Sequence, residues 1–153
     1  GQQAVRALMR GNFIMCPTLC MRRSVIGNRR FLERWQQVQD LDFTSRLLMD
    51  GECLVGSRRV GYAYRRHPGN ATALQSESLL RFEEEFALFE RVEARALELG
   101  WGRAARVARR STIVKLHLLY RTLRDLAALR PTAARAKLAL LNRRRRRGRF
   151  SST

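Results

Sequence analysis

The sequence is short of several features that define whole classes of protein. No apolar run approaches the roughly 20 residues of a membrane-spanning helix, and no basic-then-apolar leader of a secretory signal is visible. There are only 3 cysteines, an odd number without the spacing of a disulfide framework. Free thiols fit a reducing compartment. These absences favour a cytoplasmic protein folded around one core.

Acidic residues are also scarce, most of all near the C-terminal end. The chain has 31 lysines and arginines against 13 aspartates and glutamates, for a net charge of +18. Residues 1–75 carry 12 basic and 5 acidic groups, residues 76–100 carry 3 and 7, and residues 101–153 carry 16 and 1. Such a basic segment predicts contact with phosphate-bearing surfaces, which include anionic membranes and nucleic acids.

The first half of the chain is predicted to mix short strands with a helix. Three stretches have the length and composition of short strands: residues 12–16, 53–56 and 59–66. A helix is predicted over residues 40–52. Asp40 and Asp42 stand at its start, where the helix dipole favours carboxylates, and Gly51 stands at its end.

The second half is predicted to be helical. Aromatic and aliphatic residues recur at helical spacing over residues 76–100, after serines that can cap a helix. Two more helices are predicted over residues 103–142, separated at Pro131, and the first has arginines beside a leucine stripe. Residues 143–153 form a charged, self-repelling tail and are expected to be disordered.

Two short motifs stand in a suggestive order. Gln39-Asp40-Leu41-Asp42 opens the predicted helix, and Tyr64-Arg65-Arg66-His67 follows the predicted strands. This order resembles the C-terminal half of family 2 glycosyltransferases, over roughly residues 10–75. The resemblance implies an α/β fold: a partial GT-A-type, Rossmann-like domain at 1–75, followed by an α-helical extension at 76–142 and the basic tail at 143–153. It places the nucleotide-binding half of such an enzyme upstream of these residues.

The resemblance also implies roles for individual residues. Asp40 matches the general base that takes the proton of the acceptor hydroxyl, although Gln39 here replaces the family's preceding glutamate. His67 matches a histidine that helps hold the metal, Mg²⁺ or Mn²⁺, or the donor diphosphate. Arg65 and Arg66 are placed to meet phosphate oxygens, and Asp42 is a further candidate for substrate binding. The implied reaction is sugar transfer from a nucleotide-sugar donor to a hydroxyl acceptor, with inversion.

Plainer interpretations of the same residues remain open. Asp40 can equally be an ordinary carboxylate in the first turn of a helix, where it stabilises the helix dipole. Asp42 can pair with Arg46 four residues later. The charge alone is compatible with a basic membrane-surface or nucleic-acid-binding module without catalysis, although no nucleic-acid-binding motif is apparent. The membrane and enzyme hypotheses combine into one expectation: an enzyme at the inner face of the cell membrane, acting on a cell-envelope glycan or lipid-linked acceptor.

Overall fold

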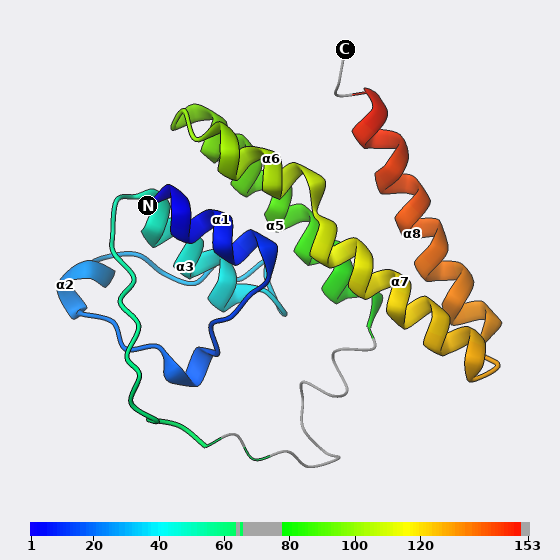
Figure 1. The fold of residues 1–153 in the computed structure, drawn as a ribbon, viewed down its shortest axis with the longest axis horizontal. Coiled ribbons are helices and arrows are strands. Elements are labelled where there is room, and N and C mark those ends of the chain that lie inside the picture. The colour runs from blue at the N-terminus through cyan, green and yellow to red at the C-terminus, as the bar shows by residue number, and fades with distance from the viewer. Residues whose placement is uncertain (64, 66–77, 151–153) are drawn as a thin grey trace.

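The chain folds into helices alone over the part that the structure describes. The computed structural model describes residues 1–63, 65 and 78–150, and within these ranges it contains no β-strand. Its elements are α1 (Gln2–Arg10), the 3₁₀ turn η1 (Cys16–Thr18), α2 (Arg23–Ile26), α3 (Gln39–Met49), α5 (Leu79–Glu98), α6 (Gly102–Arg110), α7 (Thr112–Ala127) and α8 (Pro131–Phe150). The predicted α/β, Rossmann-like fold is therefore wrong (Figure 1).

The three predicted strands are loops where the structure describes them. Residues 12–15 and 52–63 have no ladder partner, and Phe13, Val55 and Val60 are exposed to solvent. A strand is stable only when a neighbouring strand takes up its backbone hydrogen bonds. A short apolar run therefore indicates a strand only when another segment of the chain is available to pair with it.

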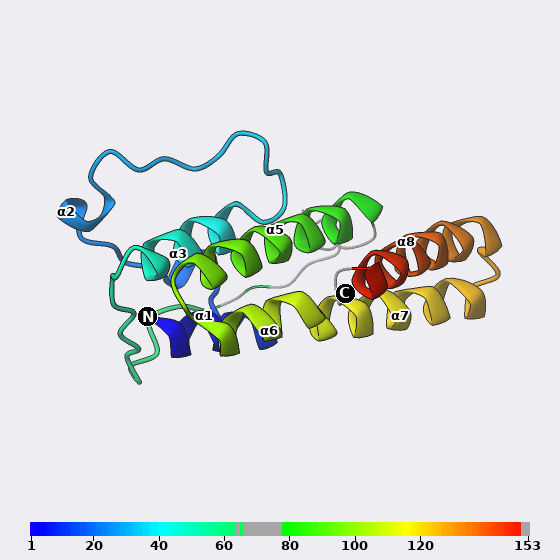
Figure 2. The same ribbon diagram turned by 90° about the horizontal axis from the view of Figure 1, so that it is seen from above.

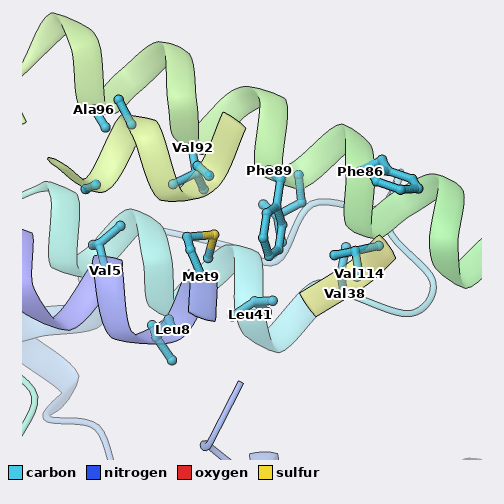
Figure 3. Packing of buried hydrophobic residues seen from close by; sticks show 14 of the residues in the cluster. Val5, Leu8, Met9, Val38, Leu41, Phe86, Phe89, Val92, Ala96 and Val114 are labelled. Atoms are coloured by element: carbon cyan, nitrogen blue, oxygen red, sulfur yellow. The ribbon is translucent and has the colours of Figure 1, made fainter. Parts of the chain in front are cut away.

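One hydrophobic core joins both halves of the sequence. Val5 and Met9 of α1, Leu41 of α3 and Phe89 and Val92 of α5 point into it (Figure 3). The small residues Ala104, Ala105 and Ala108 line the buried side of α6, which lets this helix lie close against its neighbours α5 and α1. The core thus crosses the boundary expected at residues 75 and 76.

Two helices match their predicted positions. For α3, Gly51 follows the last turn with φ +100°, a conformation that favours glycine. For α5, the Ser78 side chain accepts a hydrogen bond from the Arg81 backbone N–H at 3.4 Å, so Ser78 is the N-cap among the serines that could take this position. Both helices carry an apolar stripe at helical spacing, and this stripe is what they bury.

The C-terminal helices form an arm that extends from this core. Residues 103–142 were expected to hold two helices, but a break at Ser111, with φ 46°, separates α6 from α7. Helices α7 and α8 then lie side by side (Figure 2); both contact α5, and α7 also contacts α1. The backbone of α8 continues through Phe150, so residues 143–150 are helical rather than the expected disordered tail. Arginine is a good helix former, which lets an established helix run on through the basic segment.

Candidate functional site

Asp40 lies in the first turn of α3, directly after a loop that is held by a residue far away in the sequence. The Glu84 carboxylate of α5 is buried and accepts hydrogen bonds from the backbone N–H groups of Gln36 at 3.0 Å and Gln37 at 2.7 Å. The Gln39 side chain donates to the backbone carbonyl of Trp35. Charge-assisted bonds to backbone amides hold a loop firmly, so the start of α3 has a defined position against α5.

The Asp40 side chain is half-buried and stays close to its own helix. Its Oδ1 accepts a hydrogen bond from the backbone N–H of Leu41 at 2.8 Å. Val38 takes the N-cap position but makes no side-chain capping bond. A carboxylate here stabilises the helix dipole whatever else it does, and it is also free to face a substrate on its exposed side.

A narrow crevice lies beside Asp40. It is lined by Asn12, Ile14, Asp40, Leu41 and Thr44. Thr44 is only 5% exposed, and its hydroxyl has no hydrogen-bond partner among the described residues. A buried hydroxyl without a partner is costly, and the crevice has no room for even a water molecule beside it.

Asp42 belongs to a different environment. Positions two apart on a helix lie about 200° around its axis, so Asp40 and Asp42 face opposite ways. Asp42 is 1% exposed and accepts a hydrogen bond from Arg46 Nε at 2.8 Å. Arg46 also donates to the backbone carbonyl of Arg30 at 2.8 Å. The pair therefore ties α3 to the preceding loop, as the plainer interpretation expects.

The Asp42 side of α3 borders a larger cleft, shared with α5. Its volume is about 230 Å³. The lining residues are Asp42, Ser45, Arg46, Met49, Asp50, Leu88, Arg91, Val92 and Arg95. Ser45 is fully buried, and its hydroxyl has no hydrogen-bond partner in the described ranges. Asp42 lines this cleft but remains almost fully buried, on the face of α3 away from Asp40.

Of the predicted site residues in the Tyr64–His67 motif, Arg65 is the one that lies within the described residues. Arg65 is exposed and does not line the Asp40 crevice. Arg66 and His67 lie outside the described residues. No group of three histidine, cysteine, aspartate or glutamate side chains suited to a metal ion occurs in the described part of the chain.

Several residues around the site carried no clear signal in the sequence. Glu84 is one of three consecutive glutamates, and only the packing shows that it, rather than Glu83, receives the loop amides. Thr44 lies within the predicted helix without a motif. Asn12 falls in a predicted strand, but its Oδ1 accepts a hydrogen bond from the Ile14 backbone N–H at 3.1 Å. Its nearness to Asp40 depends on contacts between distant segments.

Comparison with known proteins does not assign the chain to a family. No protein-family model, curated protein or solved structure matches the chain. Within the described ranges, no helix combines the length and apolar character needed to cross a bilayer.

Proposed function

We propose that this chain is the acceptor-side part of a glycosyltransferase of the family 2 type, with Asp40 as its general base. The observation that carries the proposal is the placement of Asp40. It is half-buried at the start of a helix, on a loop fixed by Glu84, and on the face away from the Asp42–Arg46 pair. The order of the motifs around Asp40 and Arg65 supports the same activity.

The proposed chemistry needs one well-placed carboxylate on this side of the enzyme. A sugar hydroxyl is a poor nucleophile at neutral pH. Asp40 takes its proton as the oxygen attacks the anomeric carbon of the donor, and attack opposite the leaving nucleotide inverts that centre. The sugar is transferred and the nucleotide diphosphate leaves.

The donor side of the reaction belongs to groups outside the described residues. We place the nucleotide sugar, the cation (Mg²⁺ or Mn²⁺) and the nucleotide-binding half of the enzyme there, together with Arg66 and His67. Arg65 is the described residue that we assign to the donor phosphates. We assign a glycan or lipid-linked acceptor, and a location in the cytoplasm at the inner face of the cell membrane.

Asp40→Asn in the complete enzyme tests the proposal. We expect turnover to fall about 10²- to 10⁴-fold, the usual contribution of a general base, while calorimetry finds donor affinity nearly unchanged. The matched control is Asp50→Asn at the other end of α3, where Asp50 accepts from Arg29 Nε at 3.0 Å in an exposed pair. The control should keep wild-type turnover. Near-normal turnover of Asp40→Asn would leave Asp40 with only its role at the helix start.

A further inference from the structure

Helix α7 exposes an apolar face opposite the side that it buries. Its buried residues are Val114, Leu118 and Thr122, four apart along one line of the helix. The opposite side carries large apolar side chains that are all exposed: Ile113, Leu116, Leu119, Tyr120, Leu123 and Leu126. Leu116 and Leu123 are 57% and 56% exposed. A continuous face of this kind on a charged protein marks a surface made for a partner.

Basic groups border this face on both edges. Lys115 lies four residues before Leu119, and Arg124 lies four residues after Tyr120, so each is a neighbour of the apolar stripe on the helix surface. Beyond Arg124 is a crevice of about 110 Å³ between α7 and α8. The crevice is lined by Arg121, Arg124, Asp125, Ala128, Arg130 and Lys137, four cations against one carboxylate.

The end of the arm continues the same pattern. Leu129, in the turn between α7 and α8, is 88% exposed and has φ 56°. Leu138 on α8 is also exposed. The arm therefore combines an apolar surface with a basic border, on the segment that extends from the core in Figure 1.

The charges decide which partner fits. Leu116, Leu119, Leu123 and Leu126 have the three-four spacing of a coiled-coil seam, which by itself would suit a second copy of the chain. A coiled coil needs opposite charges beside its seam, but Asp125 is the only acidic residue in 101–153 and it accepts a hydrogen bond from Lys137. Pairing two copies would bring two strongly basic arms together. A nucleic acid would leave the leucines without a role.

We infer that the exposed face of α7 docks the chain on an anionic membrane surface, with the leucines and Tyr120 at the level of the acyl chains. Lys115 and Arg124, at the two edges of this face, then meet lipid phosphates, for which arginine has a matching fork of donors. Each basic residue near such a surface adds to the attraction, and the effect weakens with salt. This inference rests on α7 itself, and its experiment involves no sugar transfer, so it and the proposed function fail separately.

The test is flotation of the whole 153-residue chain with lipid vesicles. Vesicles of phosphatidylcholine with about 25% phosphatidylglycerol, a typical anionic surface, should bind the chain, and vesicles of phosphatidylcholine alone should bind it much less. Leu116→Gln/Leu123→Gln should weaken binding at least about tenfold, because two apolar side chains no longer enter the lipid. The matched control is Leu97→Gln, which changes a leucine that is 60% exposed on α5.

Other outcomes would overturn the inference. If the wild-type chain does not bind the anionic vesicles, the docking inference is wrong. Equal binding by the double-leucine variant would reduce the effect to charge adsorption. A wild-type dimer in sedimentation equilibrium that Leu116→Gln/Leu123→Gln dissociates would assign the face to a second copy. If the double variant does not fold, Leu123→Trp gives an independent reading. Its fluorescence should shift to the blue and be quenched by brominated lipid, and no response would reject the docking.

Discussion

The two ends of the molecule treat their large apolar side chains in opposite ways. Around α1, α3 and α5 these side chains are buried, as with Val5, Phe82 and Phe89. On α7 most of them face solvent, directly beside lysine and arginine. Burial at the first end accounts for the fold, whereas exposure at the second cannot contribute to it. The stability of the folded chain therefore does not explain why α7 exposes these leucines, and an interaction with another molecule would.

The largest expected effect tests that contrast directly. Phe82→Ala removes a fully buried ring of α5 that packs edge-on against His117, with ring centroids 5.3 Å apart. We expect it to lower the free energy of unfolding by about 3–5 kcal/mol. Leu123→Ala, on the exposed face, should change it by less than about 0.5 kcal/mol. Urea unfolding measures both. A similar loss for the two variants would mean that the leucine face is packed in solution.

A second prediction concerns the buried ion pair of the arm. Lys137 donates to Asp125, and both side chains are largely shielded from solvent. Asp125→Asn leaves the Lys137 charge without its partner among three arginines, and we expect a loss of about 3 kcal/mol. The control is Glu98→Gln, which breaks the exposed Arg95–Glu98 pair and should cost at most about 1 kcal/mol. Loss of α7–α8 helicity with the core intact would show that the arm unfolds separately.

The smallest expected effect is a pH dependence where the arm meets the core. Burial lowers the pKa of His117 from its ordinary value of 6.5, and the positive charges of Arg81 and Arg121 lower it further. The unfolded chain therefore binds a proton at higher pH than the folded chain does, so stability is lost as pH falls from 6.5 through the folded pKa.

The His117 contribution can be separated from that of the carboxyl groups. Burial raises the pKa of Glu85 and of Glu93 above 4.5, which gives the opposite sign in a more acidic range. Subtracting the unfolding free energies of His117→Gln from those of the wild type at each pH removes their effect. The difference should shrink steadily on acidification below about pH 6.5. A flat difference would show that His117 titrates alike in both states.

The sequence predicted the elements whose signals are local. Helices α3 and α5 carry their own boundaries, in Gly51 and Ser78, and their own apolar stripes. The predicted strands failed because pairing depends on other segments, which periodicity within one segment does not report. The break between α6 and α7 was missed because Ser111, rather than glycine or proline, takes the left-handed conformation, with its hydroxyl donating to the Ala108 carbonyl at 2.8 Å.

The candidate site was predictable only in part, because it too depends on segments that are distant in the sequence. The motif indicated Asp40 as a candidate, and the four-residue spacing indicated the Asp42–Arg46 pair that the structure contains. The partners that fix the site, Glu84 and Asn12, lie 44 residues after and 28 residues before Asp40. No local pattern connects such distant positions, and only the packing of α5 against α3 brings Glu84 to the loop.

The hydrogen bonds between Glu84 and the loop before α3 also determine when this loop can take its final position during synthesis. Its carboxylate receives the amides of Gln36 and Gln37, which leave the ribosome 48 and 47 residues earlier. At roughly 5–20 residues per second, the nascent chain carries this loop without its anchor for several seconds. Asp40 therefore acquires its final position only after Glu84, in the second turn of α5, has been translated. Synonymous codons that slow translation between residues 40 and 84 would lengthen this interval. During it, the apolar stripe of α3 is not yet covered by α5.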